Sequence, residues 1–222
     1  MNDVPPPPPP PYGAVPPGGA SPDVGAAISY GWNKFSANVG TFIAIIVLPA
    51  AVTFVLELIG IFVVRGFIGL FFFVALALLV GAVAYLGIFN AALMATSGQS
   101  IDFAKAFQTE RWGEWISFSL LYGLMLAVGS VICGIGALFV IAFWGLAPFY
   151  FLDQGKGPTE ALSASFATTR SKPGLPVALG LLGIVGWAGG LLCGIGSLIS
   201  VPVAIVGAAY LYRYATGQAV AP

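Results

Sequence analysis

Few residues in this chain are of types that do chemistry, and their spacing limits what that chemistry could be. The chain has 222 residues, two Cys and no His. Without imidazole, a Ser or Cys nucleophile lacks its usual general base, and two cysteines alone cannot hold a structural zinc ion. An active site would need the scattered acids Asp102, Glu110, Glu114, Asp153 and Glu160. Their positions are typical of helix starts and solvated loops, so we expect no enzyme, no catalytic residue, no metal and no cofactor.

Glu57 is the one acid inside an otherwise apolar stretch, and Arg65 follows it closely. Ionisable groups at membrane depth are often ion or proton sites. The alternative, which we favour, is an ion pair or a side chain that reaches the membrane surface. Glu57 and Arg65 are therefore the candidate intramembrane polar site.

A Cys-Gly-Ile-Gly motif occurs twice, sixty positions apart, and its Gly residues permit a sharp turn. The turn residues are Cys133, Gly134 and Gly136, and then Cys193, Gly194 and Gly196. On an oxidising face of a membrane the two cysteines could pair. Each could instead be a small buried apolar residue, which we favour because separate units need not bring them within bonding distance.

The spacing of charges shows which elements must position these residues. Hydrophobic residues make up 59% of the chain and charged residues 7%, against about 25% charged in ordinary soluble domains. The windows 115–152 and 173–212 contain no charge, and 35–101 is interrupted only by Glu57 and Arg65. Each window can hold two spans of about 20 residues. We predict an all-α, polytopic membrane bundle of six transmembrane helices, whose zero net charge excludes a nucleic-acid partner.

The six spans form three similar units, at about 21–99, 100–157 and 158–218. Each unit opens with a helix-start signal and an amphipathic stretch, continues as two apolar spans and closes on a polar tail. Three hairpins place the amphipathic stretches and both termini on one face. The basic residues on that face are Lys34, Lys105, Arg111, Lys156, Arg170, Lys172 and Arg213, with Arg65 opposite. By the positive-inside rule the termini are cytoplasmic, and the protein belongs in the bacterial cytoplasmic (inner) membrane.

Two surfaces are candidates for contact with lipid or protein. Ile28, Trp32, Phe35 and Val39 have the spacing of one helix face, which predicts a membrane-interface helix that binds lipid or simply packs on the bundle. Gly186, Gly190 and Gly194 recur every four residues. Such a pattern lets another helix approach, either within the chain or in a homo-oligomer.

The first 23 residues are a separate domain, a proline-rich arm with seven consecutive prolines from Pro5 to Pro11. It has too few apolar groups to fold, so we expect a disordered cytoplasmic arm with polyproline II character. It is either a solvated tether or a ligand for an aromatic-lined groove on a protein partner. Residues 24–218 form the transmembrane domain.

Three stretches carry a resemblance to a known group. They are residues 27–35, the Cys-Gly-Ile-Gly turn followed by Pro202, and residues 210–213. With these, residues 24–218 resemble actinobacterial proline- and glycine-rich transmembrane proteins. Those are similar to a six-span bacterial group that includes the membrane region of some glycerophosphodiesterases. The resemblance implies the six-span fold; the phosphodiesterase catalytic domain is absent here, so that activity is not implied.

These observations favour a non-catalytic membrane scaffold or accessory subunit. Its partners would be membrane lipid, a protein bound by the arm or the cytoplasmic helices, or a second copy of the chain. The alternative is a small permease or channel for a lipid-like or neutral solute, and a membrane enzyme is the third and least favoured class.

Overall fold

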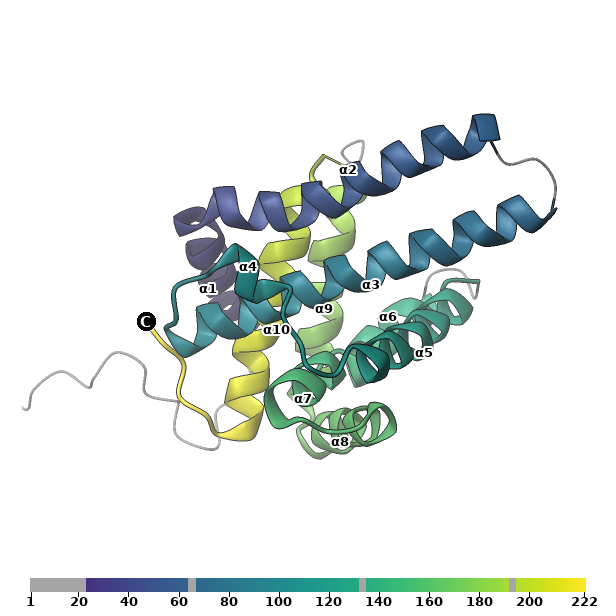
Figure 1. Cartoon of the computed structure of the whole chain (residues 1–222). Helices are drawn as coiled ribbons and strands as arrows, with labels where there is room; N and C mark the ends of the chain where they lie inside the picture. Colours follow the sequence, from purple (N-terminus) through teal and green to yellow (C-terminus); the bar gives the residue numbers. More distant parts are fainter. Residues whose placement is uncertain (1–22, 64–66, 132–134, 192–194) are drawn as a thin grey trace, which may run out of the picture.

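The computed structural model describes residues 23–63, 67–131, 135–191 and 195–222, and these ranges contain helices and no strand. The prediction of an all-α fold is confirmed for them. The proline-rich arm up to residue 22 lies outside the described residues, as do Arg65, Cys133, Gly134, Cys193 and Gly194. The elements, shown in Figure 1, are α1 (Val24–Ala37), α2 (Val39–Val63), α3 (Phe67–Ser97), α4 (Phe103–Ala106), α5 (Trp112–Val131), α6 (Ile135–Trp144), α7 (Ala147–Gln154), α8 (Pro158–Ser171), α9 (Gly174–Ala188), the 3-10 turn η1 (Gly189–Leu191) and α10 (Ser197–Thr216).

Among the described residues, five helical segments are long and apolar enough to cross a membrane. They are Val39–Gly60, Phe71–Ser97, Trp112–Val131, Ile135–Gln154 and Ser197–Thr216. The remaining expected span, the fifth in chain order, corresponds to α9, which is apolar but has 15 residues. At 1.5 Å per residue α9 is about 22 Å long, shorter than the ~30 Å hydrocarbon layer. The five long apolar helices are those of a multi-pass membrane protein. The count of six spans stays a prediction.

The long helices pack as consecutive pairs, α2 with α3, α5 with α6 and α9 with α10. In Figure 1 these hairpins extend in different directions from the part of the molecule where α7 and the C-terminal ends of α3 and α10 lie. We call that part the polar end and the opposite parts the hairpin tips. The buried core draws residues from α1 to α5 and from α7 to α10, and it includes the fully buried side chains Trp115, Phe149 and Tyr212.

Each shorter helix at the polar end packs against the last helix of a hairpin. The amphipathic α1 lies along α10, α4 lies against α3, and α8 lies against α6 and α7. The contact of α1 with α10 is close because Gly31 faces the backbone of Val203 and leaves no room for a methyl group. The hairpins are thus fastened to one another through these short helices.

Similar local features lie near the beginnings and ends of the three expected units. Asp23 accepts a hydrogen bond from the backbone N–H of Ala26 (3.1 Å), and Asp102 accepts one from Lys105 (2.9 Å). Asp23 and Asp102 are thus the N-cap residues of α1 and α4, close to the expected helix starts. The helices α3, α7 and α10 are each followed by a glycine with positive φ, at Gly98 (76°), Gly155 (65°) and Gly217 (70°).

The membrane segment Ile135–Gln154, the fourth in chain order, is interrupted in the half that lies nearer the polar end. Helix α6 ends at Trp144 and α7 begins at Ala147, because Pro148 has no N–H to donate and its ring disfavours the preceding turn. The carbonyl of Phe143, which loses its helical partner there, accepts hydrogen bonds from Ser165 Oγ (3.1 Å) and Thr169 Oγ1 (3.0 Å) of α8. By contrast, α2 and α10 continue through Pro49 and Pro202.

Candidate functional site

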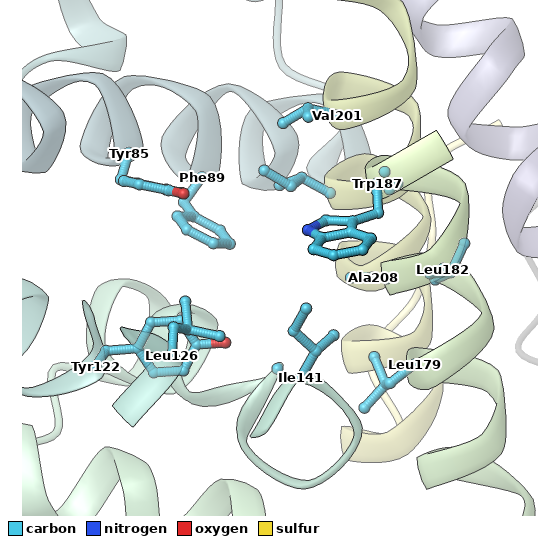
Figure 2. Close-up of a pocket in the computed structure, with 15 residues that line it drawn as sticks. Tyr85, Phe89, Tyr122, Leu126, Ile141, Leu179, Leu182, Trp187, Val201 and Ala208 are labelled. Atoms are coloured by element: carbon cyan, nitrogen blue, oxygen red, sulfur yellow. The ribbon is translucent and has the colours of Figure 1, made fainter. Parts of the chain in front are cut away.

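Among the described helices, α3, α5, α6, α9 and α10 bound a cavity of about 200 Å³, which we call the inner cavity. Its wall is mainly apolar, with Phe89, Ile141 and Leu182 among its residues. Figure 2 shows the hydroxyl groups of Tyr85 and Tyr122 turned toward this space from one side. The inner cavity therefore offers an apolar volume with a few hydrogen-bonding groups, the general form of a small-molecule site.

Two further hollows adjoin the inner cavity between α3 and α5. One, of about 210 Å³, shares Tyr85, Phe89 and Tyr122 with the inner cavity, and we call it the vestibule. The other, of about 420 Å³, is lined by residues 75–85 of α3 and 116–123 of α5, and we call it the groove. Ser119 lines both the vestibule and the groove. The three hollows thus follow one another from the α3–α5 surface into the bundle.

Ser119 carries the one buried side-chain oxygen in the described ranges that has no hydrogen-bond partner. Other serines of α5 are satisfied by their own helix; Ser117 Oγ, for example, donates to the carbonyl of Gly113 (2.8 Å). A buried hydroxyl without a partner costs about 1–3 kcal/mol, so such groups usually have an explanation. In this position a bound ligand would supply the missing partner.

The interruption of the fourth segment lies beside these hollows. Gly145, between α6 and α7, lines the inner cavity, and Pro148 lines the vestibule. Non-helical backbone at membrane depth is tolerated where it is buried in protein or faces a cavity, and interrupted helices often form ligand sites in transporters. The hollows beside Pro148 are lined by helices far away in the chain, so the local sequence does not mark this proline as part of a site.

At the polar end, side chains from three hairpins form a hydrogen-bond network, which we call the polar hub. The Tyr212 hydroxyl donates to Asp153 Oδ2 (2.8 Å), and Gln218 Nε2 donates to the same oxygen (3.0 Å). Arg213 Nε donates to Thr96 Oγ1 (2.9 Å). These bonds link the ends of α3, α7 and α10, so the polar hub holds the hairpins together at their polar end.

Aromatic rings separate the inner cavity from the polar hub. Phe89 meets Phe149 edge to face at 5.2 Å between ring centroids, and Phe149 stacks on Tyr212 at 5.5 Å. Since Phe89 also lines the inner cavity, these rings close the cavity on the side of the polar end. A ligand would therefore enter from the α3–α5 side or from the hairpin tips.

The N-terminal helix α1 joins the polar end through Tyr30. Its hydroxyl donates to the carbonyl oxygens of Ala95 (3.1 Å) and Ala221 (2.9 Å). Burial raises the pKa of Tyr30 to about 12, partly offset by the positive charge of Arg213. The hydroxyl therefore stays protonated and keeps donating at any ordinary pH.

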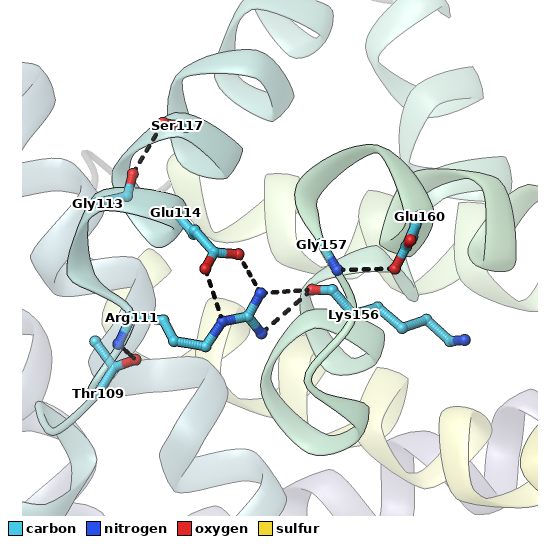
Figure 3. Close-up of polar contacts among 8 residues, drawn as sticks. All are labelled: Thr109, Arg111, Gly113, Glu114, Ser117, Lys156, Gly157 and Glu160. Atoms are coloured by element: carbon cyan, nitrogen blue, oxygen red, sulfur yellow. Dashed lines mark hydrogen bonds and ion pairs between the residues drawn. The ribbon is translucent and has the colours of Figure 1, made fainter.

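Arg111 connects the start of α5 to the loop before α8, as Figure 3 shows. Its guanidinium forms a two-point ion pair with Glu114, and it donates to the carbonyl of Lys156 at 3.4 Å. The guanidinium also lies 4.7 Å from the ring centroid of Phe151. The hydrogen bond to Glu114 raises the pKa of Arg111 above its ordinary value. These contacts are structural, and they position α5 against α7.

The acids that an enzyme would need have structural partners or lie apart. Glu160 Oε2 accepts from the backbone N–H of Gly157 (3.2 Å) at the start of α8. Asp102 caps α4, Glu114 pairs with Arg111, and Asp153 belongs to the polar hub. In the described ranges, no three residues of the types His, Cys, Asp and Glu form a group that could hold a metal ion. The acids do not converge on a common cleft.

The candidate polar site is only partly described. Glu57 is exposed on α2 and does not line the inner cavity, the vestibule or the groove. Arg65 lies outside the described residues, so the pairing of Glu57 with Arg65 stays a prediction.

The candidate interface helix is shorter than its sequence pattern indicates. Phe35 is 3% exposed and Ile28 packs against the core, whereas Trp32 is 51% exposed. Val39 does not share a helix with them, which corrects the expected single face. Helix α1 ends at Ala37, where Asn38 Nδ2 donates to the carbonyl of Lys34 (3.0 Å), and α2 begins at Val39.

The glycines marked by the four-residue spacing lie within the α9–α10 hairpin. A methyl group on Gly186 would stand 3.5 Å from Ala204 of α10, and one on Gly190 would stand 3.8 Å from Ser197. Both are ordinary contact distances, and Gly194 is outside the described residues. In the α5–α6 and α9–α10 hairpins, the glycines with no room for a methyl group include Gly129 and Gly189, and neither was predicted. They lie sixty residues apart, each four residues before a Cys-Gly-Ile-Gly motif, and this recurrence could have identified them.

The chain is similar to mycobacterial proteins whose names assign no activity. They are "Uncharacterized protein Mb2590" of Mycobacterium bovis and "Uncharacterized protein MT2637" and "Uncharacterized protein Rv2560" of Mycobacterium tuberculosis. Each is 28% identical over an alignment of 230 residues that covers 87% of this chain and 69% of the relative. No family profile matches the chain. No solved structure matches it.

Proposed function

We propose that this protein is a non-catalytic integral membrane scaffold or accessory subunit that engages lipid or a membrane partner through its apolar helices. It would lie in the bacterial cytoplasmic membrane with the polar end in the cytoplasm. The positive-inside bias supports this orientation, because Lys105, Lys156 and Arg170 lie on α4, the loop before α8, and α8.

The observation that carries the proposal is the exposure of the α2–α3 hairpin. Within an 18-residue apolar window of each helix, only 17% of the residues of α2 and 22% of those of α3 are buried within the chain, and the window of α5 is also 17% buried. Large aromatic side chains point outward from both helices, with Phe54 62% exposed and Phe71 79% exposed. Between helices in a membrane, such a surface is covered by lipid or by other transmembrane helices. The hairpin is thus available for a partner while the polar end stays fixed.

We include in the proposal six membrane crossings arranged as three units. Supporting features are the Asp caps on α1 and α4, the positive-φ glycine after α3, α7 and α10, and the packing of each short helix on the last helix of a hairpin. The fifth crossing in chain order would begin with α9 and η1.

The absence of a convergent acid cluster in the described ranges supports a non-catalytic role. The polar contacts of Asp102, Glu114, Asp153 and Glu160 cap helices or join segments. Turnover of isolated lipids by the purified protein would contradict this part of the proposal.

The test is recovery of a partner from native membranes. A photo-crosslinking residue at Phe72, which is 60% exposed on α3, should give one discrete cross-linked band. The same residue at Val177, 63% exposed on α9, is the matched control on a different hairpin and should give less of that band. Deletion of residues 1–20 tests the arm. Recovery of the protein alone, with no band from Phe72, would overturn the scaffold proposal.

The inner cavity favours a second candidate, a small permease for a lipid-like or neutral solute. Glu57 does not line the cavity, so flux would depend on the cavity rather than on that acid. In reconstituted vesicles, Tyr122→Phe should then slow the exchange of a neutral fluorescent lipid between leaflets, while Glu57→Gln should not. Vesicles with no exchange above the protein-free rate would exclude this candidate.

A further inference from the structure

We infer that the inner cavity and the vestibule bind one membrane lipid with an uncharged, hydrogen-bonding head and an acyl chain. This inference goes beyond the scaffold proposal, because it assigns a ligand site inside the bundle rather than on its exposed hairpin.

The depth of the site points to a lipid. Tyr85 lies near the middle of the span Phe71–Ser97, and Tyr122 lies near the middle of the span Trp112–Val131. At that depth the surrounding medium is hydrocarbon, not water. Tyr85 is 51% exposed, so the site opens to this medium between α3 and α5. The molecules that reach such an opening are lipids.

The lining indicates the chemistry of the head. Within the described residues, the inner cavity, the vestibule and the groove are lined by no acid or base. A charged head would be buried there without a counter-charge, at a cost of several kcal/mol. A pure hydrocarbon would leave the Ser119 hydroxyl without a partner. A hydroxyl or ester head satisfies both conditions, with Tyr85, Ser119 and Tyr122 as its partners.

The volume and shape suit a single chain. The inner cavity, the vestibule and the groove measure about 200, 210 and 420 Å³, and small-molecule sites usually span about 300–1,000 Å³. From the hydroxyl groups, the inner cavity continues between α9 and α10 past Leu182 to Trp187. Figure 2 shows this apolar part opposite the two tyrosines. We place the head at the tyrosines and the acyl chain along α9 and α10.

The probe for this site is 1-monooleoylglycerol with a photoactivatable group in its chain, added to the full chain in phosphatidylcholine nanodiscs. We expect saturable labelling of peptides from α9 or α10. Unlabelled monooleoylglycerol should compete, and anionic lysophosphatidylglycerol should compete at least tenfold less well. Labelling that is not saturable, or competition that is equal for the two lipids, would overturn the inference.

Variants of lining residues test the position. Ala208→Phe fills the inner cavity from α10 and should lower labelling at least tenfold. Ala127→Phe adds the same ring on α5 at a position that lines none of the three hollows, and should leave labelling unchanged. Equal labelling in the two variants would overturn the inference.

Hydroxyl removal tests the head group, and it keeps the inference falsifiable if Ala208→Phe does not fold. Tyr122→Phe and Ser119→Ala should each weaken monooleoylglycerol binding about three- to tenfold, the effect of one hydrogen bond. Ser117→Ala is the matched control, because that hydroxyl bonds within its own helix. Binding unchanged in both Tyr122→Phe and Ser119→Ala would contradict the inference. Loss of binding without loss of the Phe72 cross-link would separate this site from the scaffold surface.

Discussion

A methyl group on Gly129 of α5 would lie 2.6 Å from the carbonyl carbon of Gly136 in α6, so these helices touch backbone to backbone. Sixty residues later the relationship recurs, and a methyl group on Gly189 would lie 2.5 Å from the carbonyl carbon of Gly196. In both pairs the second glycine is the last residue of a Cys-Gly-Ile-Gly motif, and the first lies four residues before its Cys. In both the α5–α6 and the α9–α10 hairpin, a pair of glycines therefore lets the two backbones touch. The need for this contact accounts for the same seven-residue spacing of the glycines in both hairpins.

Gly129→Ala should destabilise the protein by about 1–3 kcal/mol, because the added methyl group forces two backbones apart. The measurement is the midpoint of thermal unfolding in detergent. Gly123→Ala on the same helix is the control, since a methyl group there meets nothing within 4 Å. Alanine favours helix over glycine by up to ~1 kcal/mol, so Gly123→Ala should be neutral or stabilising. Equal unfolding midpoints for the two variants would show that the close crossing does not exist.

The polar hub should contribute measurably to stability through Tyr212. Its hydroxyl donates to Asp153 and accepts from Gln154 Nε2 (3.0 Å), and the ring is fully buried. Tyr212→Phe removes both bonds and keeps the ring, so we expect a loss of about 1–3 kcal/mol in the same unfolding measurement. Tyr85→Phe is the control, because its half-exposed side chain lines the inner cavity instead of the polar hub. If Tyr85→Phe is the more destabilising variant, the polar hub is not what joins the hairpins.

Tyr30 should make the polar end sensitive to strong alkali. Burial disfavours the anion and raises the pKa of Tyr30 from its ordinary value of 10.0 to about 12 in the folded protein. Between these values an unfolded Tyr30 loses its proton while the folded one keeps it, so stability falls as pH rises through this window. The measurement is the ultraviolet absorbance of tyrosinate during alkaline titration of the wild type and Tyr30→Phe. The difference between the two curves should have its midpoint near pH 12. A midpoint near pH 10 would mean that Tyr30 is not buried against Ala95 and Ala221.

The amino-acid sequence predicts helices well here, because long apolar windows without charges leave helices as the available way to satisfy backbone groups in a membrane. It also predicts helix starts close to Asp23 and Asp102, because the signals for a helix start are local. It predicts helix ends less well. Val39 continues the apolar pattern of α1, yet the side chain of Asn38 bonds to Lys34 and ends that helix.

The candidate ligand site could not be predicted from the sequence. Tyr85, Tyr122 and Ala208 are unremarkable members of three different apolar windows, and they share a cavity because α3, α5 and α10 converge. The Ser119 hydroxyl is likewise notable because it is buried without a hydrogen-bond partner. This depends on the packing of distant residues, so no local sequence pattern predicts it. In the sequence, Glu57 is a candidate polar site only because it is charged within an apolar stretch. In the described structure its side chain does not line any of the three hollows.

The proposed topology requires that α4 and α8 lie on the same side of the membrane. In a background with both native cysteines replaced by Ser, Lys105→Cys and Arg170→Cys should react with a membrane-impermeant maleimide in inverted vesicles and not in intact cells. Ile135→Cys at the α5–α6 tip, where the native side chain is 71% exposed, should show the opposite pattern. The reason is physical: α5 and α6 form a hairpin of apolar helices, and a membrane places the two ends of such a hairpin in different aqueous phases. Reaction of Lys105→Cys and Arg170→Cys from different sides would separate α4 from α8. The contact of Arg111 with the carbonyl of Lys156 could not then form, because it requires the starts of α5 and α8 to meet at one surface.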